Sequence, residues 1–106
     1  MVRSLIALCV FTIGLAATAS AQDGAKIFAD QKCTLCHSIA GKGNAKGSLD
    51  DVGSKLSADE IRSWITDSKG MTAKTKATRK PEMKAYSLPK AEVDALVTYL
   101  SSLKKK

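Results

Sequence analysis

The sequence predicts an all-α domain of three to four helices. Residues 57–68 and 89–103 carry apolar side chains at helical spacing, and residues 23–36 are also compatible with a helix. No stretch alternates apolar and polar residues over a length typical of a strand. The 106 residues hold one small domain at most. Domains of this size often depend on a disulfide, a metal or a cofactor for their stability.

The first 21 residues have the pattern of a secretory signal peptide. Arg3 supplies the positive start, residues 5–17 form an apolar run, and residues 19–21 supply the small side chains that precede a cleavage site. The alternative is an uncleaved membrane anchor. The apolar run of 13 residues is shorter than the roughly 20 that span a bilayer, so the sequence favours cleavage.

Cleavage would leave residues 22–106 as the mature domain. Cys9 lies inside the apolar run and follows a leucine, where a lipoprotein processing site requires a small residue, so we expect this cysteine to be discarded. The loss of Arg3 lowers the formal net charge from +7 to +6. We therefore expect an exported protein of the bacterial periplasm, with no stable membrane insertion after cleavage.

The predicted helices have distinct signatures. The helix over 23–36 has Asp23 near its positive N-terminal end and Ile27 and Phe28 as apolar anchors. The helix over 57–68 begins with a capping box formed by a serine at its first position and a glutamate three residues later. Its apolar residues are Ile61, Trp64 and Ile65. The helix over 89–103 begins at a proline, and its apolar stripe is Val93, Leu96, Val97, Leu100 and Leu103.

Two segments between the helices read as irregular. Residues 38–54 contain four glycines, which let the backbone pass close to a flat ligand. Residues 69–87 are basic, poor in large apolar side chains and interrupted by Pro81. We expect both segments to form loops.

Residues 33–37 form a C-x-x-C-H motif, the strongest signal in the chain. Two thiols at this spacing can add to the two vinyl groups of a haem, and the adjacent histidine can then coordinate the iron. The motif therefore predicts one haem c, attached through Cys33 and Cys36 and ligated by His37.

Three other uses of the motif are weaker. A thioredoxin-like dithiol normally follows a strand, and no strand pattern precedes Cys33. A structural zinc site needs four ligands, whereas the mature chain offers two cysteines and one histidine. A disulfide between Cys33 and Cys36 would close a very small loop and stabilise little.

Methionine is the remaining soft ligand for the sixth position of the iron, because the chain has no second histidine. The mature chain contains Met71 and Met83. Pro81 stiffens the segment before Met83, and the last helix follows soon after. Met71 follows Gly70 at the end of the second helix, a more flexible setting. We expect Met83 to be the sixth ligand, with Met71 as the alternative.

Trp64 is a further candidate contact of the cofactor. A tryptophan at this helical position is typical of a core, and in a small haem protein much of the core consists of haem contacts. Its indole N–H needs an acceptor, which a haem propionate can provide.

The order of these features resembles that of the small class I c-type cytochromes, which are monohaem electron carriers. The resemblance covers residues 22–106 and implies a cytochrome c-like fold, with the helices wrapped around one covalently bound haem. It also implies that the first and last helices cross, which brings Phe28 against Leu96 and Tyr99.

Two positions differ from the family pattern. Family members often have a proline after the haem motif whose carbonyl oxygen accepts the N–H of the axial histidine, and Ser48 stands at the corresponding place here. Many also have a proline directly after the ligand methionine, where this chain has Lys84.

The resemblance implies a monomeric carrier, not an enzyme, that moves single electrons between respiratory or other redox proteins. The basic residues of segment 69–84 imply partners with acidic patches, the alternative being an ordinary solvated surface. A nucleic-acid partner is not expected for an exported protein. Two other functions stay open: a haem subunit docked on a larger oxidoreductase, and a peroxidase or gas-binding protein with an open iron site.

Overall fold

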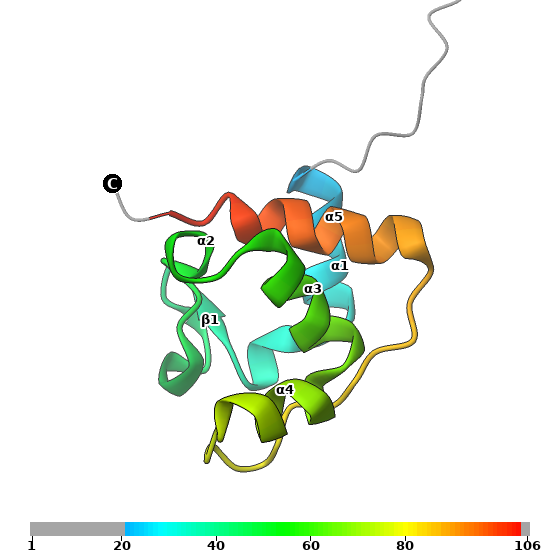
Figure 1. Ribbon diagram of the computed structural model, residues 1–106. Helices are drawn as coiled ribbons and strands as arrows, with labels where there is room; N and C mark the ends of the chain where they lie inside the picture. Colours follow the sequence, from blue (N-terminus) through cyan, green and yellow to red (C-terminus); the bar gives the residue numbers. More distant parts are fainter. Residues whose placement is uncertain (1–20, 105–106) are drawn as a thin grey trace, which may run out of the picture.

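The computed structural model describes residues 21–104 (Figure 1). The predicted signal peptide and Cys9 lie outside these residues, apart from Ala21 at the start of the first helix. The α-helices of the described part are α1 (Ala21–Asp30), α2 (Val52–Lys55), α3 (Ala58–Thr66), α4 (Ser68–Thr75) and α5 (Lys90–Ser101). Two 3-10 turns and two short strands complete it: η1 (Cys33–Leu35), β1 (Ser38–Ile39), β2 (Lys42–Gly43) and η2 (Ala45–Gly47). None of the helices between residues 21 and 104 has the length and hydropathy to cross a membrane.

Helices α1 and α5 cross and make the most extensive contact between two elements of the structure (Figure 1). The rings of Phe28 in α1 and Tyr99 in α5 meet edge to face, with centroids 6.2 Å apart and an interplanar angle of 65°. Phe28 and Leu96 belong to the same buried cluster. The expected contacts of Phe28 with Leu96 and Tyr99 are therefore confirmed.

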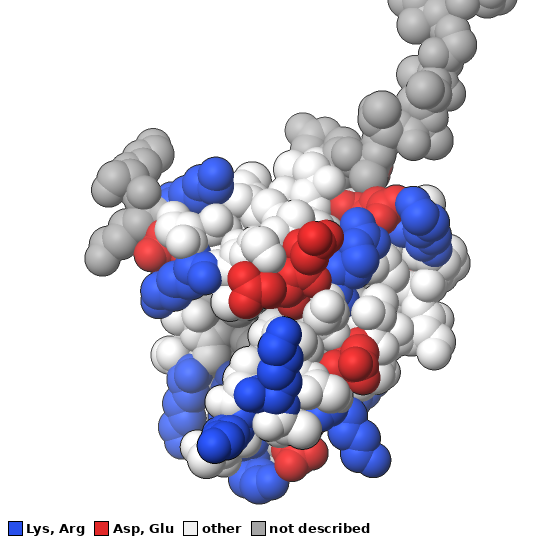
Figure 2. All heavy atoms as spheres, viewed as in Figure 1, with Lys and Arg blue, Asp and Glu red and all other residues white. Residues whose placement is uncertain are grey.

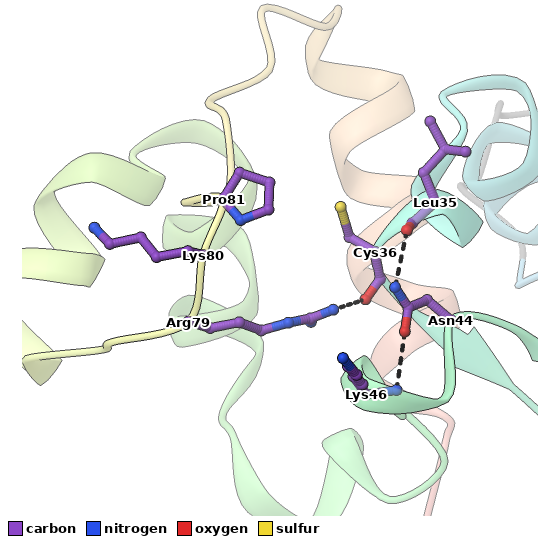
Figure 3. Close-up of a pocket in the computed structure, with 7 residues that line it drawn as sticks. All are labelled: Leu35, Cys36, Asn44, Lys46, Arg79, Lys80 and Pro81. Atoms are coloured by element: carbon purple, nitrogen blue, oxygen red, sulfur yellow. Dashed lines mark hydrogen bonds between the residues drawn. The ribbon is translucent and has the colours of Figure 1, made fainter.

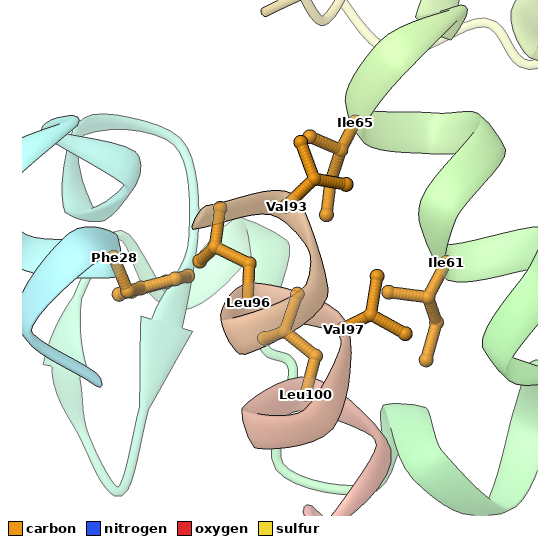
Figure 4. Close-up of a cluster of buried hydrophobic side chains, with 7 residues drawn as sticks. All are labelled: Phe28, Ile61, Ile65, Val93, Leu96, Val97 and Leu100. Carbon is orange, nitrogen blue, oxygen red and sulfur yellow. The ribbon is translucent and has the colours of Figure 1, made fainter. Parts of the chain in front are cut away.

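The core forms where α5 passes between α1 and α3, as Figure 4 shows. The buried cluster consists of Phe28, Ile61, Ile65, Val93, Leu96, Val97 and Leu100. Burial of each side chain of this size contributes about 1.5–3 kcal/mol relative to exposure. The predicted stripe is confirmed for Val93, Leu96, Val97 and Leu100. Helix α5 ends at Ser101, two residues before the predicted end, so the half-buried Leu103 packs against the cluster from the segment after the helix.

The predicted capping box starts α3. The Ser57 hydroxyl accepts a hydrogen bond from the Glu60 backbone N–H at 3.1 Å, and the Glu60 carboxylate accepts one from the Ser57 N–H at 3.0 Å. The helix ends at Thr66, two residues before the predicted end. The apolar anchors Ile61 and Ile65 face α5 from here.

Helix α4 corrects the expectation that the basic segment after α3 is irregular from residue 69. Asp67 ends α3 and caps α4, because its carboxylate accepts a hydrogen bond from the Gly70 N–H at 3.3 Å. Ser68 and Met71 are buried and anchor the helix. Lys76, in the left-handed conformation with φ 56°, ends it.

The first helix is shorter than predicted. It ends at Asp30, and Lys32 takes a left-handed conformation with φ 58°, so the chain leaves the helical path before Cys33. The C-x-x-C-H motif therefore starts in the 3-10 turn η1 and not in the last turn of α1.

The glycine-rich segment contains more regular structure than the sequence indicates. Strands β1 and β2 pair antiparallel, with Ser38 opposite Gly43 and Ile39 opposite Lys42. Gly41 and Gly43 have φ values of 79° and 111°, which side chains disfavour. The two-residue strands and the four-residue helix α2 are too short to leave a periodic signal in the sequence.

Candidate functional site

The C-x-x-C-H motif folds into one compact turn. The N–H groups of Cys36 and His37 both donate to the carbonyl oxygen of Cys33, at 3.1 and 2.9 Å. Both thiols are free, with Cys33 half-buried and Cys36 exposed. Burial raises the pKa of the Cys33 thiol above its ordinary value, and the nearby Lys84 charge partly opposes that rise. The turn thus presents two free thiols and an imidazole from five consecutive residues.

The His37 imidazole is oriented by the backbone of η2. Its Nδ1 atom lies 3.0 Å from the carbonyl oxygen of Gly47, and donation from Nδ1–H leaves Nε2 with the lone pair that a metal requires. Burial lowers the pKa of His37, the Gly47 hydrogen bond opposes this change, and the charge of Arg79 adds to the lowering. These effects favour the neutral imidazole, the form that binds metal.

Gly47, and not Ser48, supplies the carbonyl oxygen that the histidine needs, which corrects the expectation from the sequence. A Cβ atom at position 47 would lie 2.1 Å from the Cys36 carbonyl oxygen and 2.9 Å from His37 Nδ1. The packing around this carbonyl leaves no room for a side chain, so glycine stands one residue before the predicted position.

Asn44 ties the η2 turn to the motif and was not predicted as a site residue. Its backbone N–H lies 3.1 Å from the carbonyl oxygens of both Thr34 and His37. Its side-chain amide donates to the Leu35 carbonyl at 3.2 Å, and its side-chain oxygen accepts from the Lys46 N–H at 3.0 Å. An asparagine among glycines was the available signal, since this side chain often bonds backbone in turns.

Arg79 connects the segment after α4 to the motif. It extends across to Cys36, and its Nη2 donates to the Cys36 carbonyl oxygen at 2.5 Å (Figure 3). An open cavity of about 570 Å³ lies beside this contact. Its lining residues are Leu35, Cys36, Asn44, Lys46, Arg79, Lys80 and Pro81. Arg79 was predicted only as one of several surface charges.

Tyr86 holds the other end of the same segment. Its backbone N–H donates to the Ile65 carbonyl oxygen in α3 at 2.9 Å. Burial raises the pKa of the Tyr86 hydroxyl, and the thiols of Cys33 and Cys36 contribute to the rise, so the phenol lies within electrostatic range of the motif. The Lys84 ammonium stands 4.9 Å from the centre of the Tyr86 ring.

The two candidate methionines occupy different settings. Met83 is half-buried in the extended segment between Arg79 and Tyr86. Met71 is 7 % exposed inside α4, which corrects the expectation that it lies in a flexible setting at the end of the second helix. Trp64 is half-buried on α3 and, like Met71, does not belong to the buried cluster around α5. These positions do not identify which methionine binds the iron, so Met83 as the sixth ligand stays a prediction.

The donor set fits a covalently attached haem. Cys33 and Cys36 provide the thiols for two thioether bonds, and His37 provides an oriented nitrogen ligand. Thioether sulfur is available from Met83 or Met71. Large apolar side chains outside the core cluster, such as Trp64, suit contact with a porphyrin.

Comparison with known proteins gives one family. The protein-family model described as Cytochrome c matches residues 21–104. This range includes the motif, the η2 turn, both candidate methionines and the crossing helices. Neither the curated proteins nor the solved structures gave a significant match.

Proposed function

The chain belongs to the cytochrome c family, and from that membership we propose that it is a single-electron carrier whose iron is ligated by His37 and Met83. The family binds covalently attached haem c, and its members are generally electron carriers rather than enzymes. When bound, the haem supplies a one-electron Fe(III)/Fe(II) couple. The observation that carries the proposal is the oriented His37 ring beside two free thiols.

The chain's own residues fix the cofactor and keep its ligands in place. Cys33 and Cys36 would hold the group covalently, so that it could not dissociate from so small a protein. Gly47 orients His37 through the Nδ1–H hydrogen bond and increases the basicity of the opposite nitrogen. The Trp64 indole N–H is our candidate donor to a propionate.

Two contacts support Met83 as the sixth ligand. Arg79 bonds Cys36 four residues before Met83, and Tyr86 bonds Ile65 three residues after it. Both ends of the Met83 segment are therefore held near the motif or near α3. A methionine restrained on both sides can keep its position in both oxidation states, and a His–Met pair raises the reduction potential.

The ligand assignment is tested by replacing each methionine in the haem-loaded protein. We expect Met83→Ala to retain haem through denaturation, because the thioethers are untouched, and to lose the absorption spectrum of low-spin six-coordinate iron. Met71→Ala is the matched control and should keep that spectrum. The opposite result would assign Met71. If the parent protein already has high-spin iron and neither substitution changes its spectrum, a peroxidase or gas-binding function would be favoured.

Basic side chains surround the lower part of the molecule in Figure 2, over α4 and the segment that follows it. Residues 69–84 contain six basic residues and one acidic residue, and all six basic side chains are exposed. Leu35, 70 % exposed, lies beside the cavity that Lys46 and Lys80 also line. An apolar contact ringed by positive charge suits a brief encounter with an acidic patch on a redox partner.

We also propose that the protein acts in the bacterial periplasm as a monomer, after removal of residues 1–21. The support is the pattern of the N-terminal sequence. N-terminal sequencing of protein from the periplasmic fraction should begin at Gln22, and its elution should match one chain. Stable co-purification with a larger protein would favour the alternative of a docked haem subunit.

A further inference from the structure

We propose that Arg79 is a positioning residue that raises the reduction potential and holds the Met83 segment against the haem-attachment motif. The inference rests on the proposed function, because it concerns the iron that His37 and Met83 are proposed to bind. It assigns to one arginine a role separate from partner docking.

The position of the guanidinium is the first observation. Arg79 reaches a residue 43 positions earlier in the chain, and its Nη2 donates to the Cys36 carbonyl oxygen. Its Nη1 lies 2.2 Å from the point that a Cβ of Gly47 would occupy. Gly47 is also the residue whose carbonyl oxygen faces His37 Nδ1. The guanidinium therefore stands beside the carbonyl group of Cys36, as Figure 3 shows, and beside Gly47, whose carbonyl oxygen orients His37.

The charge of Arg79 is the second observation. An arginine stays protonated at every physiological pH. Among residues 21–104, the ion pairs involve Lys26, Arg62, Lys80 and Lys90, so no carboxylate is paired with Arg79. Oxidation adds one positive charge at the iron, and a fixed cation nearby disfavours that charge. Arg79 therefore favours the reduced state.

The mechanical role follows from where the segment is held. The bonds from Arg79 to Cys36 and from Tyr86 to Ile65 restrain the two sides of Met83. Removal of the first bond leaves the exposed stretch from Lys76 to Pro81 without that contact to the motif. The Met83 sulfur would then leave the iron more often and give an external ligand more frequent access.

The experiment compares three variants of the full haem-loaded protein. Arg79→Gln removes the charge, and Arg79→Lys keeps the charge but removes the planar guanidinium, which can donate two parallel hydrogen bonds. Lys80→Gln is the matched control, because it removes a neighbouring cation that pairs with Glu82 at the surface and not with the motif. Two quantities are measured: the midpoint potential by redox titration, and the rate at which imidazole binds the ferric protein.

We expect Arg79→Gln to lower the equilibrium constant for reduction about three- to tenfold, where tenfold corresponds to about 59 mV for one electron. Imidazole should bind this variant several-fold faster than the parent. Arg79→Lys should change the equilibrium constant for reduction by less than about twofold and should still bind imidazole faster than the parent. Lys80→Gln should change both quantities by less than about twofold.

The proposal would be overturned if Arg79→Gln and Lys80→Gln had the same midpoint potential and bound imidazole at the same rate. If Arg79→Gln yields too little haem-loaded protein, an imidazole rate in Arg79→Lys equal to that of the parent would overturn it as well. A wrong assignment of Met83 would appear in the spectrum of Met83→Ala, in which Arg79 is intact. The two failures are thus distinguishable.

Discussion

Gly24 in α1 lies directly against the backbone of Ala95 in α5. A Cβ atom at position 24 would stand 2.2 Å from the Ala95 carbonyl oxygen and 2.4 Å from the Cβ of Tyr99. The two helices can cross this closely only because position 24 has no side chain. The edge-to-face contact of Phe28 with Tyr99 lies one turn further along α1 and depends on the same crossing.

We expect Gly24→Val to separate α1 from α5 and to destabilise the haem-loaded protein by about 1–3 kcal/mol, the usual cost of overpacking. Chemical denaturation followed by fluorescence or circular dichroism measures this loss. Ala29→Val is the matched control, because Ala29 is exposed in the same helix and should lose only about 0.5 kcal/mol of helix propensity. Equal losses in the two variants would contradict the close crossing.

Gly47→Ala should disturb the orientation of His37. The added Cβ would lie 2.1 Å from the Cys36 carbonyl oxygen and 2.2 Å from Nη1 of Arg79. These distances are too short for non-bonded atoms, so the η2 turn must move. We expect a loss of about 1–3 kcal/mol in stability and a lower midpoint potential, because the hydrogen bond to Nδ1 changes. Ala45→Ser adds one atom at an exposed position of the same turn and should leave both quantities unchanged.

The capping box makes part of the stability depend on pH. Hydrogen bonds from the Ser57 backbone and side chain lower the pKa of Glu60 below its ordinary value near 4.5. A carboxyl group whose pKa is lower in the folded than in the unfolded protein stabilises the fold at pH values above its unfolded-state pKa. This contribution disappears as the pH falls through its folded-state pKa. The stability difference between the parent and Glu60→Gln should therefore shrink toward zero on acidification below about pH 4.5. A difference that stays constant with pH would contradict this assignment.

Ser57→Ala removes the other half of the box and should destabilise α3 by about 1 kcal/mol at neutral pH. The measurement is again the free energy of unfolding. Ser54→Ala is a suitable control, because Ser54 is exposed within α2 and caps no helix.

Electron transfer to an acidic redox partner should slow as salt is added, because the ions screen the attraction. At low ionic strength, Lys76→Gln with Lys80→Gln should reduce the second-order rate several-fold. Lys55→Gln, in α2, removes an exposed charge outside the basic segment and should have a smaller effect. Rates independent of salt would remove the support for docking by the basic segment.

The features that the sequence predicted correctly are those with local signals. The capping box at Ser57 and Glu60 lies within four residues, and the stripe of α5 repeats within one helix. The start of α4 was missed because its cap is also the end of α3 and its anchors are one serine and one methionine. Helical periodicity is weak in a short segment with so few apolar side chains.

The details of the site depend on contacts that no local pattern contains. Gly47 takes the place expected for Ser48 because the packing around Cys36 and His37 selects the position. The contact of Arg79 with Cys36 joins residues 43 positions apart. A count of basic residues identifies Arg79 as one charge among several and gives no information about its acceptor.

The crossing of α1 and α5 also has a consequence for how the chain folds. It joins segments about 70 residues apart, and closing a loop of that length costs chain entropy that no short local element repays by itself. The motif follows α1 directly, so its thiols lie at the edge of an interface that is complete only after the last helix has arrived. We expect cofactor attachment to be easiest on a chain in which this closure is still open, and the docking of α5 to be the step that commits the protein to its folded state.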